Sequence, residues 1–300
     1  MRWHRSGIVV LALALTACTP FSATTAAHGT AARETAAAPT AAAPTTAAAP
    51  SSSSAAPSVR PVAPSHVPAT VPAVAPRPAP APRAPAAPVV VLDPGHNGGN
   101  ASHPATINAP VPDGRGGTKP CNTTGTATNA GYPEHAFTWD VALRMRSLLQ
   151  AAGVRVVMTR PDDVGVGPCV DVRGRLAGKV GAAAFVGIHG DGAAPGGHGF
   201  HVITSSLAPA GPRVGSASAG LARTIRDAMT AVEPVSTYLG RGGLDPRPDL
   251  AGLNLNTVPA VYVECGNMRN AGDAAWMSSA SGREAVARRL AAGVLTFLGR

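Results

Sequence analysis

Hydrophobic residues in the last two thirds of the chain alternate between short runs and longer periodic stretches. The short runs are rich in β-branched residues and predict strands at 89–93, 154–159, 183–189, 199–205 and 260–265. Between 134 and 152, apolar residues recur with the spacing of one helix face, and Gly153 follows where a helix stop belongs. The same pattern predicts further helices at about 171–181, 214–231 and 283–298.

Strands that alternate with helices are typical of an α/β domain with a mostly parallel sheet and helices on both faces. The stretch 98–131 interrupts this order. It is rich in Gly, Asn, Thr and Pro and has no period. Loops of this length inside a compact domain are usually functional or disordered.

Composition confines the folded part to one domain, 88–300. Residues 19–87 are almost entirely Ala, Pro, Ser and Thr, with Phe21 the single aromatic residue. Such a segment buries too little apolar surface to offset the entropy of ordering, so we interpret it as a disordered tether.

The first eighteen residues have the pattern of an export signal. Two arginines precede a short apolar run, which ends in Leu15-Thr16-Ala17-Cys18. This ending resembles the bacterial lipobox and implies cleavage before Cys18 and lipidation of that residue. We therefore expect a protein anchored by lipid to the outer face of the cell membrane, acting in the cell wall space. Simple secretion without the lipid is the alternative.

The net charge is divided between the two parts of the chain, +5 before residue 88 and +4 after it. A modestly basic domain suits an anionic surface such as a cell wall. No run of Lys and Arg interleaved with aromatic residues is present, which disfavours nucleic-acid binding. Without a repeat or a coiled coil, a monomer is the default expectation.

Three cysteines remain after Cys18, namely Cys121, Cys169 and Cys265. An exported chain meets a compartment that permits disulfides, and three single bridges are conceivable. We favour Cys121 with Cys169, because both lie in loops rich in Gly and Pro. Cys265 directly follows a predicted strand and is expected to be a buried free thiol.

Four polar side chains are expected at one edge of the sheet. His96 follows the end of the first predicted strand, His189 and Glu264 end two others, and Glu134 lies in the first turn of a helix near its buried face. Ligands of open parallel sheets bind at the carboxyl ends of the strands, where these residues converge. Two histidines and a carboxylate with a vacant fourth position are typical of a catalytic zinc site, and a second carboxylate can serve as its base.

Several alternatives compete with this interpretation. An isolated histidine or an early-helix glutamate often has no catalytic role, and other histidines remain available as ligands: His103, His135, His198 and His201. Glu233, in a loop beside Pro234, is expected to be solvated. A serine hydrolase would need a GxSxG elbow, which the stretch from Gly215 to Gly220 does not provide.

Five motifs in this order resemble the zinc-dependent N-acetylmuramoyl-L-alanine amidases of the Amidase_3 family, in particular the single-domain mycobacterial type. They are LDPGH (92–96), the early-helix Glu134, VVMTR (156–160), GIHGDG (187–192) and VPAVYVECGNMRN (258–270). The resemblance covers essentially all of 88–300. It implies a twisted mixed sheet flanked by helices, and hydrolysis of the amide between the muramic lactyl group and L-alanine of peptidoglycan or its fragments.

Matched by position, His96, Glu134 and His189 correspond to the zinc ligands of the family and Glu264 to its catalytic glutamate. Some members close their site with a helix or hairpin, so 98–131 is a candidate gate that a Cys121–Cys169 bridge would hold. Two alternatives to the amidase are a non-catalytic wall-binding lipoprotein and a metal-dependent deacetylase on the same fold.

Overall fold

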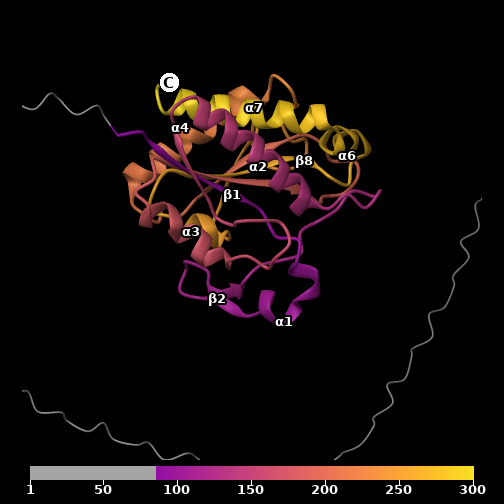
Figure 1. Cartoon of the computed structure of the whole chain (residues 1–300), viewed down its shortest axis with the longest axis horizontal. Helices are drawn as coiled ribbons and strands as arrows, with labels where there is room; N and C mark the ends of the chain where they lie inside the picture. The colour runs from indigo at the N-terminus through magenta and orange to yellow at the C-terminus, as the bar shows by residue number, and fades with distance from the viewer. Residues whose placement is uncertain (1–85) are drawn as a thin grey trace, which may run out of the picture. The chain divides into compact units, whose positions relative to one another are not determined.

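The computed structural model describes residues 86–300, which form a six-stranded sheet with helices on both sides (Figure 1). The strands lie in the order β4-β1-β5-β8-β6-β7. Their bounds are β1 Val89–Pro94, β4 Arg155–Met158, β5 Ala184–Asp191, β6 His201–Ser205, β7 Leu244–Arg247 and β8 Ala260–Asn267.

The sheet is mixed, as expected. Strand β1 pairs in parallel with β4 and β5, and β5 pairs in parallel with β8. Strand β6 runs antiparallel to β8, and β7 is parallel to β6. The carboxyl ends of β1, β5 and β8 therefore lie side by side at one edge of the sheet. Strand β7 was not predicted, because its sequence LDPR contains a proline and two charges instead of an apolar run.

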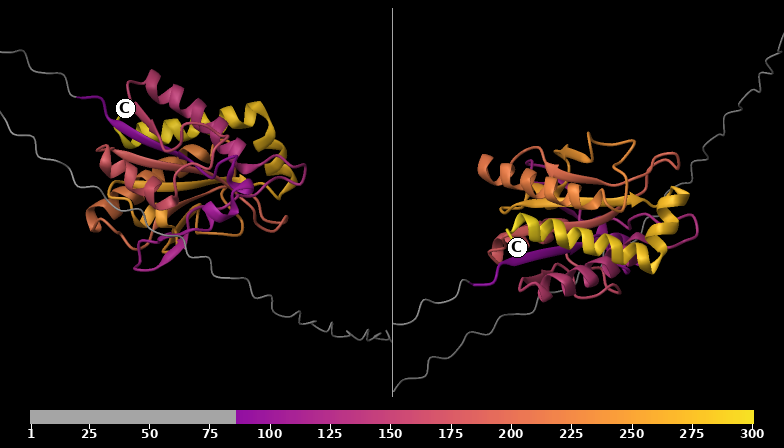
Figure 2. Two further views of the ribbon diagram at one scale, coloured as in Figure 1. Left: turned by 60° about the horizontal axis from the view of Figure 1, so that its bottom comes forward. Right: turned by 90° about the horizontal axis from the view of Figure 1, so that it is seen from above.

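Two hydrophobic cores fill the space between the sheet and its helices (Figures 1 and 2). Helices α2 (Glu134–Ala151), α4 (Pro212–Met229) and α7 (Ala280–Phe297) cover one face, and α3 (Val170–Lys179) and α5 (Ala251–Asn254) cover the other. Alternate residues of β1 enter opposite cores, Val90 and Leu92 on one side and Val89 and Val91 on the other. This burial on both faces explains why the central strands are continuously apolar.

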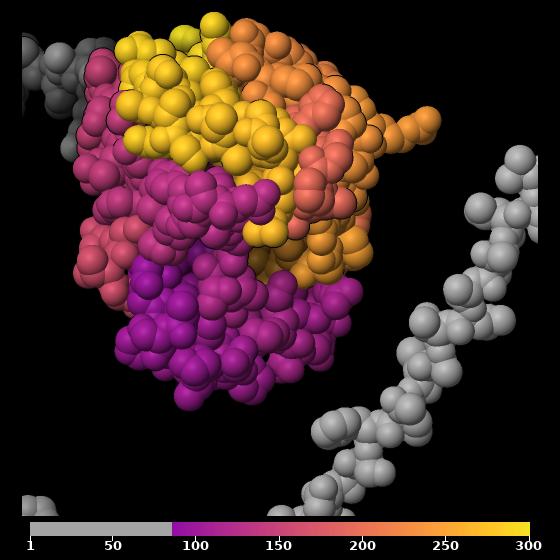
Figure 3. All heavy atoms as spheres, turned by 90° about the vertical axis from the view of Figure 1, so that its right-hand side faces the viewer, coloured from indigo at the N-terminus to yellow at the C-terminus, as the bar shows by residue number. Residues whose placement is uncertain are grey.

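The segment 98–131 is more structured than its sequence indicated. It contains the 3-10 turn η1 (Asn100–Ser102), the short helix α1 (Pro104–Ile107) and a hairpin of β2 (Pro110–Pro112) and β3 (Thr118–Pro120). The expected disulfide joins Cys121, at the end of this hairpin, to Cys169, just before α3. In the space-filling view the segment forms the lower part of the domain, beneath the C-terminal helices (Figure 3).

The C-terminal helix begins earlier than expected, and a separate helix, α6 (Ala271–Ser278), precedes it. Asn270 caps α6 by accepting bonds from Gly272 N and Asp273 N, and Ser279 caps α7 by accepting one from Gly282 N. Asn and Ser are preferred N-caps, so the signal was present in the sequence. Cys265 is a buried free thiol, as predicted.

The predicted signal peptide with Cys18 and nearly all of the tether fall outside the described residues, so these interpretations remain predictions. Among the helices of 86–300, none combines the length and the apolar character needed to cross a bilayer.

Candidate metal centre

Four residues from distant segments meet where the central strands end. His96 follows β1, His189 and Glu264 lie near the ends of β5 and β8 and are partners in their register, and Glu134 is the first residue of α2. All four line one cavity, whose volume is about 340 Å³. The sheet topology thus brings together the four residues that the sequence predicted at one edge of the sheet.

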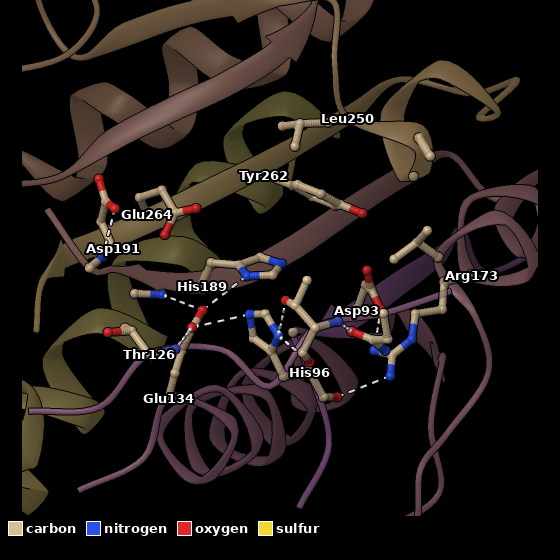
Figure 4. A pocket seen from close by; sticks show the side chains of 18 of the residues that line it. Asp93, His96, Thr126, Glu134, Arg173, His189, Asp191, Leu250, Tyr262 and Glu264 are labelled. Atoms are coloured by element: carbon tan, nitrogen blue, oxygen red, sulfur yellow. Dashed lines mark hydrogen bonds and ion pairs between the residues drawn. The ribbon is translucent and has the colours of Figure 1, made fainter. Parts of the chain in front are cut away.

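Three of the four form a compact cluster in which Glu134 lies between two imidazoles (Figure 4). His96 Nε2 is 3.1 Å from Glu134 Oε2, and His189 Nδ1 is 3.0 Å from Glu134 Oε1. One nitrogen from each histidine and one carboxylate oxygen lie within 4.8 Å of one another. Glu264 is outside this cluster, beside His189.

The segment 98–131 supplies partners that orient these donors. His96 Nδ1 donates to the carbonyl of Thr123 at 3.1 Å, because a carbonyl only accepts, and Nε2 is therefore the ring nitrogen that faces Glu134. Glu134 Oε2 accepts from Thr126 N at 2.9 Å, and Oε1 accepts from Gly190 N at 3.1 Å.

Backbone geometry brings the segments unusually close. His96 has a φ of 60°, a conformation rare outside glycine, and this turn directs its ring away from the strand. A Cβ at Gly125 would lie 2.8 Å from Glu134 Oε2 and 2.9 Å from the His96 ring. Only glycine lets the chain pass this close to the two side chains.

The pKa values of the two buried carboxyl groups, Glu134 and Glu264, are shifted in opposite directions. Burial raises the pKa of Glu134, but His96 and His189 outweigh this effect and hold its pKa well below the usual range. Burial, together with the charges of Glu134 and Asp191, raises the pKa of Glu264 well above the usual range. Its Oε2 atom is buried without a hydrogen-bond partner. Glu134 is thus held as an anion, whereas the raised pKa of Glu264 makes its carboxylate the stronger base of the two.

Two buried arginines, which were not identified from the sequence as part of the site, fix the backbone around His96. Arg173 of α3 bonds to Asp93 at 3.0 Å, to Pro94 O at 2.9 Å and to His96 O at 3.0 Å. Arg160 donates to Pro94 O and to His135 O, each at 3.0 Å. Arg160 ends the VVMTR motif, but nothing in that motif shows that its guanidinium is fully buried.

The cluster fits a metal ion by the chemistry of its donors. Two imidazoles and a carboxylate are the ligand types of catalytic zinc sites. The second hydrogen bonds of His96 and Glu134 are those that usually orient such ligands. The donor atoms of His96, Glu134 and His189 lie within 4.8 Å of one another, which is close enough for one ion to bind all three.

The alternative histidines do not join the cluster. His135 bonds to Asp163 at 2.8 Å, and His103 bonds to Gly99 O at 2.8 Å. His201 is fully buried on β6, in register with Glu264, and His198 lies in the loop before β6.

The expectation that Glu233 is solvated was wrong. This residue is only 8% exposed, and its carboxyl group contacts that of Asp273 on α6. The loop sequence around Glu233 does not indicate that Asp273 of α6 lies beside it.

Residues 90–296 match the family described as N-acetylmuramoyl-L-alanine amidase, Amidase_3. The chain is 47% identical over 214 residues to the N-acetylmuramoyl-L-alanine amidase Rv3717 of Mycobacterium tuberculosis, covering 71% of this chain and 87% of that protein. Its fold matches crystal structures of the N-acetylmuramyl-L-alanine amidase Ami1. For Mycobacterium smegmatis Ami1 the identity is 50% and the TM-score 0.68, over 71% of this chain and 98% of the other. For Mycobacterium abscessus Ami1 the values are 49% and 0.67, over 71% and 99%.

Proposed function

This chain belongs to the Amidase_3 family of N-acetylmuramoyl-L-alanine amidases, and from this premise we propose how its site hydrolyses peptidoglycan. The bond cleaved is the amide between N-acetylmuramic acid and L-alanine of the stem peptide. The observation that carries this proposal is the His96–Glu134–His189 cluster, which shares one cavity with the unpaired carboxyl oxygen of Glu264.

We assign zinc as the metal and His96, Glu134 and His189 as its ligands. Their two imidazole nitrogens and one carboxylate oxygen support zinc over magnesium or calcium, which prefer sites made of oxygen ligands. A zinc ion in such a site supplies Lewis acidity. The oriented hydrogen bonds from Thr126 and to Thr123 hold the ligands in place before the ion arrives.

Glu264 is the proton carrier of the reaction. Its Oε2 atom takes a proton from the attacking water while the water oxygen bonds to the amide carbonyl carbon. The carbon–nitrogen bond then breaks, and Glu264 returns the proton to the departing nitrogen. The products are a free lactyl carboxyl group and a peptide with a free L-alanine amine. No other buried carboxyl oxygen among residues 86–300 lacks a partner and faces this cavity.

Mass spectrometry of purified muropeptides, incubated with and without a chelator, tests the activity. We expect free lactyl ends and released peptides that begin with L-alanine, and we expect both to disappear with the chelator. Release of acetate instead would identify a deacetylase. No change in the muropeptides would indicate a wall-binding protein without catalysis, and either result would overturn the proposal.

Glu264→Gln tests the role of the proton carrier. It is expected to bind zinc normally but to lose about 10²–10⁴-fold in turnover, because its amide cannot accept the proton from water. Glu284→Gln is the matched control, because it makes the same chemical change at a residue outside the cavity. Glu284 lies on α7 and forms ion pairs with Arg144 of α2 and Arg288 of α7. Full activity of the Glu264 variant would refute the assignment.

We also propose that the protein is exported and anchored through a lipid on Cys18. The apolar run and lipobox-like ending of residues 1–18 support this localisation. Metabolic labelling with a fatty acid, compared between the wild type and Cys18→Ala, provides the test. An unlabelled wild-type protein would contradict the anchor and leave the amidase proposal intact.

A further inference from the structure

Two cationic side chains line the same cavity from segments far apart in the sequence. Lys119 lies on β3 of the hairpin, and Arg247 ends β7 at the edge of the sheet. Both contact Asp249. Lys119 Nζ donates to its backbone oxygen at 3.1 Å, and Arg247 Nε and Nη2 donate to its carboxylate at 3.0 and 2.8 Å. Asp249 therefore holds the two cations together beside the cavity.

Their hydrogen-bonding capacity is only partly used. An ammonium has three donors and a guanidinium five, so these contacts leave two free on Lys119 and three on Arg247. Arg173, the third cation of the cavity wall, differs because it donates to Pro168 O, Asp93, Pro94 O and His96 O. Lys119 and Arg247 are therefore the lining cations that are equipped to bind an anion.

The hairpin is held firmly enough to place Lys119. Cys121, two residues further on, is tied by the disulfide to Cys169, and its backbone N–H donates to Ala109 O at 2.8 Å. At the other end of the hairpin, Asn254 of α5 donates to Asp113 O at 3.2 Å. The backbone that carries Lys119 is thus fixed by covalent and hydrogen-bonded links on both sides, and the bond to Asp249 O directs its ammonium.

We propose that Lys119 and Arg247 form a subsite for a carboxylate of the substrate, carried by the side chain of the residue that follows L-alanine. This inference rests on the proposed amidase function. The peptide is the part of that substrate that carries carboxylates, and Lys119 and Arg247 line the same cavity as Glu264 and the candidate metal ligands, which places them near the residues next to the scissile amide. Charge-assisted hydrogen bonds to two cations select an acid over its amide.

Three synthetic N-acetylmuramoyl-L-alanyl tripeptides test the subsite. The first has a side-chain carboxylate at the residue after L-alanine and an amidated C-terminus. The second has the corresponding amide at that residue, and the third is the second with a free C-terminal carboxylate. We expect the first peptide to have a KM about tenfold below the other two, with a smaller difference in kcat.

Lys119→Met and Arg247→Gln are each expected to raise the KM of the first peptide about tenfold, toward that of the second. Lys179→Met is the matched control, because Lys179 is exposed at the end of α3 and does not line the cavity. Thermal unfolding midpoints of all variants establish that each variant is folded at the temperature at which its KM is measured.

The possible outcomes separate this inference from the proposed function. Cleavage of all three peptides with equal KM, or a KM increase in the variants that is the same for all three, would overturn the subsite but not the amidase. Preference for the third peptide would overturn the assigned position of the carboxylate. Failure of the wild type to cleave any of them would refute the amidase itself.

Discussion

Replacing Arg160 by methionine tests whether a buried guanidinium sets the distance between two ligand segments. Arg160 is fully buried and bonds to Pro94 O, two residues before His96, and to His135 O, one residue after Glu134. Arg160 shares this bridging position with Thr138, whose hydroxyl bonds to Gly95 O at 2.8 Å and to His135 O at 3.1 Å. Burial lowers the pKa of Arg160 to about 10, which still leaves it protonated at neutral pH.

The magnitude follows from the hydrogen bonds that are lost. Methionine has a similar length but no donors, so the carbonyls of Pro94, His135 and Asp162 all lose a bond of 3.0 Å or less, although Pro94 O keeps its bond from Arg173 and His135 O keeps its bond from Thr138. Each hydrogen bond lost costs about 1 kcal/mol, which gives a loss of about 3 kcal/mol in the free energy of unfolding. Asp163 adds little, because it is partly exposed and keeps its bond to His135.

Urea unfolding measures this loss, and calorimetric zinc titration measures its effect on the site. We expect zinc affinity to fall about 10–100-fold, as for other residues that orient metal ligands. Arg155→Met, at the exposed start of β4, the strand that precedes Arg160, is the control and should change stability by less than about 0.5 kcal/mol. Loss of stability in Arg160→Met with unchanged zinc affinity would show that the arginine supports the fold without setting the ligand spacing.

Two further predictions concern stability. Burial and the neighbouring Asp273 raise the pKa of Glu233 to about 7, above its unfolded value, so its contribution to stability is present below about pH 4.5 and is lost as pH rises through 7. The wild type should lose about 1–2 kcal/mol over this range, after discounting for solvent screening, and Glu233→Gln should abolish that decline in urea unfolding. Replacing Cys121 and Cys169 by serine opens a loop of 48 residues and should cost about 4 kcal/mol. It should also lower turnover, and a gain in turnover would favour a gating role for 98–131.

The central strands and the four candidate residues were predictable because their signals are local. A run such as VVVLDP is apolar and β-branched, and a polar residue directly after it must lie at the sheet edge. His96, His189 and Glu264 could therefore be placed by strand order alone. Glu134 was identifiable by its position in the first turn of α2 and by its motif.

The parts that escaped prediction depend on tertiary contacts. Arg160 and Arg173 resemble surface arginines in sequence, and only the fold shows that each bonds to carbonyls around His96. Strand β7 has no apolar period, because it lies at the edge of the sheet and its Arg247 faces the cavity. Glu233 became buried because α6, whose start was not predicted, covers its loop with Asp273.

The segment 98–131 contributes to the candidate metal site itself, and this limits what a gating movement would permit. Thr123 O accepts from His96 Nδ1, and Thr126 N donates to Glu134 Oε2, so both candidate ligands depend on the backbone of the segment. A displacement large enough to uncover the cavity would break these bonds and move Lys119 away from Arg247. The hairpin is also fastened at Cys121 and at Asp113. We therefore infer that substrate enters past a fixed wall, and that the disulfide preserves activity by keeping that wall in place.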